Sequence, residues 1–237
     1  MEHTPILNIQ NLRVAFTSNT GLNEVLHGIS YNLFPNEILG IVGESGSGKS
    51  VASLAIMGLL PLNKSSISTG EIIFKNSDLL RYSQKEIEAL RGQKIAMIFQ
   101  EPMSALNPSM CCGKQVEEIL LQHTTITPKA AKTEVLRLFA AVKIPAPKDT
   151  FKKYPHEISG GQQQRVMIAL AIACKPDILI ADEPTTALDV TVQKDIISLL
   201  KTLQKESKMS VIFISHDLAL VSEIADRILV MYKGNII

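Results

Sequence analysis

The chain has 237 residues, and 24 Lys and Arg against 23 Asp and Glu leave a net charge of +1. This near-neutral balance excludes a surface that binds nucleic acid or anionic lipid by charge alone. With 46% hydrophobic and 20% charged residues, the composition is typical of a globular domain with a substantial core. A signal peptide is not expected because Glu2 and Pro5 stand where a basic start and an apolar run are needed. The longest nearly apolar stretch, Val51–Leu62, is too short to span a membrane.

Short apolar runs alternate with helical patterns along the chain, which indicates an α/β protein. We expect strands at Ile6–Phe16, Gly28–Leu33, Ile38–Val42, Gly70–Phe74, Ile95–Phe99, Ile178–Ala181, Val211–Ser215 and Arg227–Tyr232. Four of them are almost wholly apolar, as central parallel strands covered on both faces would be: Ile38–Val42, Ile95–Phe99, Ile178–Ala181 and Val211–Ser215. The two N-terminal runs and Gly70–Phe74 are mixed, which favours an antiparallel sheet with one solvated face.

A helical region is predicted between Pro102 and His156, where prolines recur and no strand pattern is found. The patterns at Val116–Gln122 and Lys129–Ala141 predict helices there. A further amphipathic helix is expected at Asp189–Gln204.

A glycine-rich segment directly follows the apolar run Ile38–Val42 and has the spacing G-x-x-x-x-G-K-S; it reads Gly43-Glu44-Ser45-Gly46-Ser47-Gly48-Lys49-Ser50. Glycines allow backbone N–H groups to surround a polyphosphate, and the helix expected from Val51 adds the positive end of its dipole. Lys49 is expected to reach the β- and γ-phosphates, and the Ser50 hydroxyl to bind Mg²⁺. The alternative is a flexible Gly/Ser loop, which the lysine and serine in register argue against.

Two adjacent acids, Asp182 and Glu183, end the apolar strand Ile178–Ala181. Because a buried unpaired charge is costly, acids at the carboxyl end of such a strand usually have a function. We expect Asp182 to hold Mg²⁺, and Glu183 to act as the general base that polarises the water attacking the γ-phosphate. The alternative is an acid pair that caps a helix in the turn before Pro184.

A second anion-binding pattern lies at Ile158-Ser159-Gly160-Gly161-Gln162, which resembles the signature L-S-G-G-Q of the ATP-binding cassette (ABC) ATPases. Ser159 and the glycines at a helix start would present a hydroxyl and backbone N–H groups to a phosphate. The alternative is a flexible N-cap without a ligand.

Other motifs of the ABC ATPases are also matched in this sequence, in the order in which the family has them. Gln100 matches the glutamine that contacts Mg²⁺ and the attacking water, and His216 matches the histidine that contacts the γ-phosphate. Ala187-Leu188-Asp189 matches the D-loop, preceded by Thr186 where the family usually has serine, and Asp189 is therefore expected at the ATP site. Phe16 matches the aromatic residue that stacks on adenine, the alternative being a simple core residue.

The resemblance implies a P-loop NTPase core with a mostly parallel central sheet, an N-terminal antiparallel β subdomain and an inserted helical subdomain. The implied segments are 1–100 (ATP-binding core), 101–163 (helical subdomain) and 164–237 (core continued). In this family the signature reads the ATP of a second cassette, so Ser159, Gly160, Gly161 and Gln162 are expected to act in trans in a head-to-tail homo- or heterodimer. Transmembrane permease subunits would hold the chain at the cytoplasmic side of the inner membrane, with a solute-binding protein as an indirect partner.

Within the family, the segments 100–108 and 183–191 resemble ATPase subunits of bacterial importers of di- and oligopeptides. The prediction is therefore an ATPase that powers peptide import with ATP and Mg²⁺. One alternative is an importer of nickel or another small solute, and a second is a soluble ABC ATPase acting on nucleic acid or ribosomes. The near-neutral charge argues against the second alternative.

The three cysteines, Cys111, Cys112 and Cys174, form neither a disulfide framework nor a zinc pattern, and we expect them to be reduced. Peptide-importer relatives usually continue beyond the point corresponding to Ile237 with helices and clustered cysteines. We therefore expect this chain to be part of a longer one, and no cysteine-bound cluster to be carried over.

Overall fold

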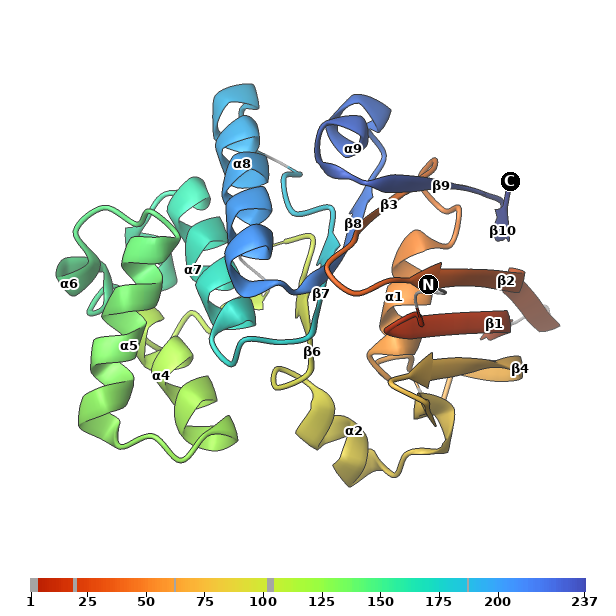
Figure 1. Cartoon of the computed structure of the whole chain (residues 1–237), viewed down its shortest axis with the longest axis horizontal. Coiled ribbons are helices and arrows are strands. Elements are labelled where there is room, and N and C mark those ends of the chain that lie inside the picture. The colour runs from red at the N-terminus through yellow and green to blue at the C-terminus, as the bar shows by residue number, and fades with distance from the viewer. Residues whose placement is uncertain (1–3, 19–20, 62, 102–104, 187) are drawn as a thin grey trace. The chain divides into compact units, whose positions relative to one another are not determined.

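Strands and helices alternate along the chain in the computed structural model, which describes residues 4–18, 21–61, 63–101, 105–186 and 188–237 (Figure 1). The strands are β1 Leu7–Ser18, β2 Gly21–Leu33, β3 Ile38–Val42, β4 Ser65–Phe74, β5 Ser77–Asp78, β6 Ile95–Ile98, β7 Ile178–Asp182, β8 Ser210–Ser215, β9 Arg227–Tyr232 and β10 Asn235–Ile236. The α-helices are α1 Lys49–Ile56, α2 Gln84–Leu90, α4 Cys112–His123, α5 Pro128–Ala141, α6 Pro147–Thr150, α7 Gly160–Ile172, α8 Val190–Ser207 and α9 Leu218–Ile224. The described residues also form two 3₁₀ turns, η1 Leu79–Arg81 and η2 Pro155–Glu157.

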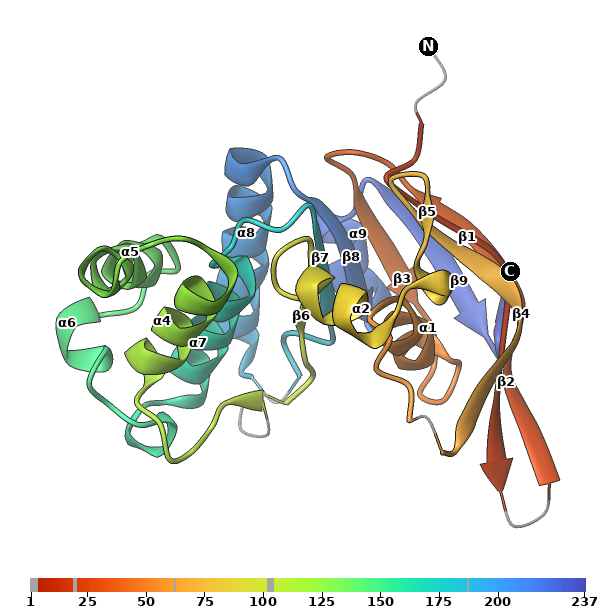
Figure 2. The same cartoon turned by 90° about the horizontal axis from the view of Figure 1, so that it is seen from below.

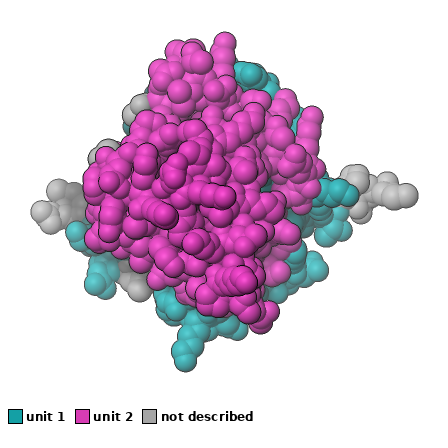
Figure 3. All heavy atoms as spheres, turned by 90° about the vertical axis from the view of Figure 1, so that its left-hand side faces the viewer, with its two compact units in different colours: residues 1–88, 208–237 teal, residues 89–207 magenta. Residues whose placement is uncertain are grey.

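The chain forms two compact units, residues 1–88 with 208–237 and residues 89–207, which are coloured separately in Figure 3. The described residues within 101–163 form helices and no strand, as the sequence predicts for this segment. The segment boundaries at 100 and 163 stay a prediction.

An antiparallel sheet occupies the N-terminal part of the first unit, with strand order β2-β1-β4-β5. Leu7 of β1 pairs with Leu33 of β2 on one side and with Phe74 of β4 on the other. This confirms the predicted antiparallel β subdomain. The predicted start of the second strand at Gly28 is wrong, because cross-strand pairing with β1 extends β2 back to Gly21, beyond its apolar part.

Each unit contains buried strands that pair in parallel. In the first unit β3 lies between β8 and β9 and runs parallel to both, and β10 joins β9 as an antiparallel partner. In the second unit β6 and β7 pair in parallel. Every residue of β3, β6, β7 and β8 is buried. All four strands predicted to be parallel and covered on both faces are therefore confirmed as such. The prediction that the run Ile95–Phe99 is central is wrong, because β6 stands at the end of the strand order and pairs, among the described strands, with β7 alone.

Helices α4, α5 and α7 of the second unit pack on one another, as Figure 2 shows. Each helix has buried apolar side chains, among them Val116 of α4, Val135 and Phe139 of α5 and Met167 of α7. The periodicity that predicts these helices places such residues on one face. Among the described residues, no helix combines the length and apolarity that a membrane span requires.

Candidate active site

A glycine-rich loop joins β3 to α1 and closes around the side chain of Lys49. This lysine is only 5% exposed, and its Nζ donates hydrogen bonds to the carbonyl oxygens of Gly43 at 2.7 Å and Glu44 at 2.9 Å. The predicted helix start at Val51 is wrong: Gly48, with φ 102, is the N-cap, so α1 begins at Lys49. The loop thus holds one positive charge at a helix N-terminus, where an anion is favoured.

Several features of this loop fit a polyphosphate. A Cβ on Gly43 would lie 2.2 Å from the carbonyl oxygen of Met231, so only glycine fits there. Gly46 has φ +79, and open space among the described residues where a Cβ would be. The Ser47 hydroxyl is buried and has no hydrogen-bond partner within the described part of the chain. A buried hydroxyl without a partner is unfavourable, and a phosphate oxygen would satisfy it.

The loop is supported from behind by the hairpin between β9 and β10, a contact that the sequence analysis missed. The Gly234 N–H donates to the carbonyl oxygen of Ser47 at 3.0 Å, and the His27 N–H donates to the carbonyl oxygen of Gly234 at 2.9 Å. Lys233 and Gly234 both have positive φ, 45° and 76°, as a two-residue type I′ turn requires. The Lys-Gly pair after an apolar strand was the signal that could have predicted this turn.

Gly234→Ala is expected to weaken nucleotide binding by about 10-fold and to lower the free energy of unfolding by roughly 1–3 kcal/mol. The new methyl group would lie 2.3 Å from the carbonyl oxygen of Val25 and 2.6 Å from the His27 ring, displacing the turn from the loop. Binding of a fluorescent ATP analogue and urea unfolding measure the two effects. Gly21→Ala is the matched control because its φ is also positive, +122, but an added Cβ meets no neighbouring atom within 4 Å among the described residues. An unchanged ATP affinity in a folded Gly234→Ala variant would contradict the role of Gly234 in supporting the glycine-rich loop.

His216 follows β8, and the loop follows β3, at the same end of two paired strands. The register sets Val42 opposite Ser215, so Gly43 and His216 are the next residues on neighbouring parallel strands. The His216 side chain is exposed. The next residue, Asp217, caps α9 by accepting hydrogen bonds from the N–H groups of Ala219 and Leu220. The first unit therefore brings the predicted histidine and the predicted loop to one edge.

Gln100 and Glu183 meet at the corresponding edge of the second unit. Ile98 pairs with Ala181, so the residues after β6 and at the end of β7 lie close together. The Gln100 Nε2 donates to Glu183 Oε2 at 3.2 Å. Asp182 is buried as the last residue of β7, whereas Glu183 is partly exposed. The structure thus joins two residues that the sequence places 83 positions apart.

The signature segment begins α7 and forms a reciprocal cap. Ser159 Oγ accepts from the Gln162 N–H at 3.4 Å, and Gln162 Oε1 accepts from the Ser159 N–H at 3.3 Å. Gly160 is exposed, and a Cβ there would meet no described atom within 4 Å, whereas a Cβ on Gly161 would lie 3.1 Å from Val192 of α8. Ser159 is thus the N-cap of α7, as the alternative interpretation expects. The exposed start of the helix can also bind an anion.

Two further predicted ATP-site residues, Asp189 and Phe16, lie in a helix cap and in a strand. Asp189 Oδ1 accepts from the N–H groups of Thr191 at 3.1 Å and Val192 at 2.9 Å and so caps α8. Ala187, predicted in the same loop, lies outside the described residues. Phe16 is half-buried in β1, paired with Asn23 and Ser65.

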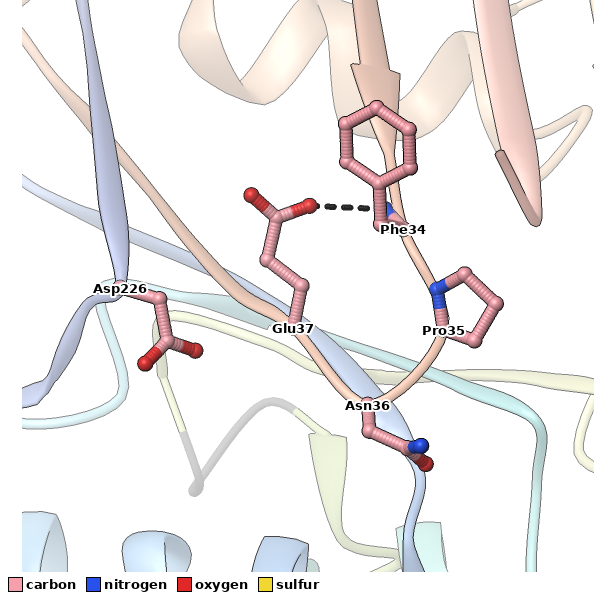
Figure 4. A pocket seen from close by; sticks show the side chains of 5 residues that line it. All are labelled: Phe34, Pro35, Asn36, Glu37 and Asp226. Carbon is pink, nitrogen blue, oxygen red and sulfur yellow. Dashed lines mark hydrogen bonds between the residues drawn. The ribbon is translucent and has the colours of Figure 1, made fainter. Parts of the chain in front are cut away.

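A pocket lies at the opposite end of β3, lined by Phe34, Pro35, Asn36, Glu37 and Asp226 (Figure 4). Its acids have structural partners: Glu37 accepts from the Phe34 N–H at 2.7 Å and from Arg227 Nε at 2.8 Å, and Asp226 from the Ile38 N–H at 2.8 Å. Ligands of parallel α/β sheets bind at the carboxyl ends of the strands. This pocket is at the amino end, so the loop edge is the better candidate.

A model of the ABC transporter family matches residues 26–186, a segment that contains the loop, the signature and the acid pair. The chain belongs to the ABC transporter family. This match confirms the predicted family and the ATPase class, and this ABC ATPase binds nucleotide. The roles of individual side chains stay predictions.

Curated relatives match this ABC ATPase over nearly its whole length. The dipeptide transport ATP-binding protein DppD of Bacillus subtilis is 52% identical over 97% of this chain and 68% of its own. The oligopeptide transport ATP-binding protein OppD of the same organism is 48% identical over 99% of this chain and 65% of its own. DppD of Haemophilus influenzae is 51% identical over 98% of this chain and 70% of its own. The chain thus spans about two thirds of the length of these relatives.

Solved cassettes share the fold. The dimeric post-hydrolysis structure of the ATP-binding cassette MJ0796 with ADP and Pi has a TM-score of 0.87 at 27% identity, covering 97% of this chain and 96% of that one. A cbiO1 structure from Clostridium perfringens, part of the ABC transporter complex cbiONQ, has a TM-score of 0.83 at 30% identity, covering 98% and 87%. These likenesses confirm the predicted fold class of the ABC ATPase.

Proposed function

We propose that this ABC ATPase hydrolyses ATP to power the import of di- and oligopeptides through a partner permease. The similarity to DppD and OppD of Bacillus subtilis, 52% and 48% identical over nearly the whole chain, supports the peptide substrate. The observation that carries the hydrolytic step is the hydrogen bond between Gln100 and Glu183. It joins a carboxylate able to accept a proton to an amide able to orient water.

ATP binds at the loop in this proposal. The backbone N–H groups of residues 43–50 surround the phosphates, and Lys49 exchanges the carbonyl oxygens of Gly43 and Glu44 for the β- and γ-phosphate oxygens. Phe16 stacks on the adenine.

Mg²⁺ fits the oxygen donors that the chain offers. Ser50 supplies a hydroxyl, Gln100 an amide oxygen and Asp182 a carboxylate, which are ligand types that Mg²⁺ prefers. When bound, the ion neutralises charge on the phosphates. Ser50 is exposed at the start of α1 and Asp182 ends β7, so both lie at carboxyl ends of parallel strands.

Glu183 accepts a proton from the attacking water, which Gln100 helps to orient, and His216 donates a hydrogen bond to the γ-phosphate. A carboxylate within reach of the water raises its nucleophilicity as the proton is transferred. The cation of Lys49 stabilises the charge that develops on the transferred phosphoryl group.

A second cassette completes each site in a head-to-tail dimer. Ser159, Gly160, Gly161 and Gln162 present the start of α7 to the nucleotide of the partner cassette, and Asp189 lies near the same nucleotide. Closure of the dimer is transmitted as a rigid-body movement to permease subunits, which hold the chain at the cytoplasmic side of the inner membrane and receive solute from a binding protein. The dimeric MJ0796 cassette supports this arrangement.

Uptake of labelled di- and tripeptides tests the substrate. Cells that carry the complete transporter are expected to accumulate peptide, and cells that lack this chain are expected to lose that uptake. Nickel uptake is measured in parallel. Loss of nickel uptake with normal peptide uptake would support the metal-importer alternative, and unchanged uptake of both would contradict an import role.

A further inference from the structure

A tight turn after β7 fixes the backbone of Glu183. The turn comprises Glu183, Pro184, Thr185 and Thr186, and the Thr186 N–H donates to the carbonyl oxygen of Glu183 at 3.2 Å. Proline at the second position favours such a turn. Glu183 has φ 47, the left-handed region that non-glycine residues rarely adopt. Unfavourable backbone conformations persist where the surrounding structure holds them, and they cluster at functional sites.

The Thr186 side chain adds a second hydrogen bond within the same turn. Its Oγ1 donates a hydrogen bond to Glu183 Oε2 at 3.0 Å. Gln100 Nε2 reaches the same oxygen at 3.2 Å. Two donors therefore hold the Glu183 carboxylate: Gln100, which precedes β7 in the sequence, and Thr186, which follows it. Hydrogen bonds to a carboxylate are among the stronger ones in proteins.

The turn has a separate link to α8 that does not involve Thr186. Gln193 Nε2 donates to Thr185 Oγ1 at 3.1 Å, and Thr185 is buried. The backbone bond of the turn and this link remain when the Thr186 hydroxyl is removed. A Thr186 variant can therefore fold while the orientation of the Glu183 carboxylate changes.

We propose that Thr186 is a positioning residue for ATP hydrolysis, because its hydroxyl fixes the Glu183 carboxylate in the orientation that accepts a proton from water. The proposal rests on the proposed role of Glu183 as general base. In this proposal Thr186 acts through Glu183, to which both its hydroxyl and its backbone N–H donate hydrogen bonds. Its contribution is therefore expected in kcat and not in nucleotide binding.

Thr186→Val tests this role, since valine keeps the branched shape and removes only the hydroxyl. We expect kcat for ATP hydrolysis to fall by roughly 10-fold, the effect of one hydrogen bond to a charged group, while KM and the Kd of ATP stay within about two-fold. Thr186→Ser keeps a hydroxyl and is expected to restore most of the rate. Thr202→Val is the matched control, because Thr202 is exposed on α8 and its hydroxyl donates to the carbonyl oxygen of Ser198 within the same helix.

Amide hydrogen exchange of the nucleotide-free chain gives a readout independent of activity. The amides of residues 185 and 186 are expected to keep wild-type protection in Thr186→Val, because the backbone bond of the turn and the Gln193 link remain. Wild-type kcat in Thr186→Val, a rate in Thr186→Ser as low as in Thr186→Val, or faster exchange of these amides, which would show a merely structural role, would each overturn the proposal.

The Glu183→Gln and Glu183→Gln/Thr186→Val variants separate this proposal from the proposed function. If Thr186 acts through Glu183, the second substitution changes the residual rate of Glu183→Gln by no more than about two-fold. A further 10-fold loss in the double variant would overturn the positioning role. Wild-type turnover in Glu183→Gln would instead overturn the role of Glu183 as base.

Discussion

Glu183→Gln is expected to lower kcat for ATP hydrolysis by at least about 100-fold, the contribution of a positioned general base. Glutamine has the same shape, and its amide oxygen can still accept the hydrogen bonds from Gln100 and Thr186, but it cannot take the proton of the attacking water. ATP affinity should stay within about two-fold of the wild type. Phosphate release under saturating MgATP and equilibrium binding of ATP measure the two quantities.

The same variant should accumulate as an ATP-bound dimer, because the closed state no longer decays by hydrolysis. Size-exclusion chromatography with light scattering distinguishes dimer from monomer. Glu206→Gln is the matched control, since this carboxylate is exposed in the last turn of α8. Turnover at the wild-type rate in Glu183→Gln would exclude Glu183 as the base.

Ser159→Arg is expected to abolish ATP-dependent dimerisation while the monomer still binds ATP. Ser159 is exposed at the N-cap of α7, and arginine there places a long side chain where the partner's nucleotide is proposed to lie. Loss of the cap itself costs only about 1 kcal/mol. Dimerisation is measured in the Glu183→Gln background, where the closed dimer accumulates.

Thr127→Arg controls for the lost cap. Thr127 is the exposed N-cap of α5, and its side chain accepts from the Ala130 N–H as Ser159 accepts from Gln162. The control should form the ATP-bound dimer. Ser159→Arg protein that dimerises with ATP as well as Thr127→Arg does would rule out the trans role of the signature.

The central strands could be predicted because burial on both faces leaves an unbroken apolar run. The predicted range Ile38–Val42 has the bounds of β3, and Val211–Ser215 differs from β8 only at its first residue. The strand register then brings predicted site residues together: Gly43 and His216 follow paired residues of β3 and β8, and Gln100 is hydrogen-bonded to Glu183. The loops at strand ends were therefore predictable from sequence spacing.

Contacts set by backbone geometry could not be predicted in the same way. The Lys-Gly pair indicates the turn between β9 and β10, but the close approach of Gly234 to Ser47, which supports the loop, has no signal in the sequence spacing. The left-handed conformation of Glu183 has no residue-type signal, because glutamate carries a Cβ and seldom adopts it. Short elements such as α9 and β10 have too few residues for a periodic pattern.

In this account, the glycine-rich loop with Lys49 binds the ATP that the chain hydrolyses. The most direct test measures phosphate release from MgATP by the purified wild type and by Lys49→Ala. Lys49 is buried and bonded only to loop carbonyls among its described hydrogen bonds, so its removal takes the positive charge from the proposed phosphate site. Lys85→Ala, which removes an exposed lysine from α2, is the control. The account predicts sustained release by the wild type and by Lys85→Ala, and a loss of at least about 100-fold in Lys49→Ala. Equal release by all three proteins would contradict it.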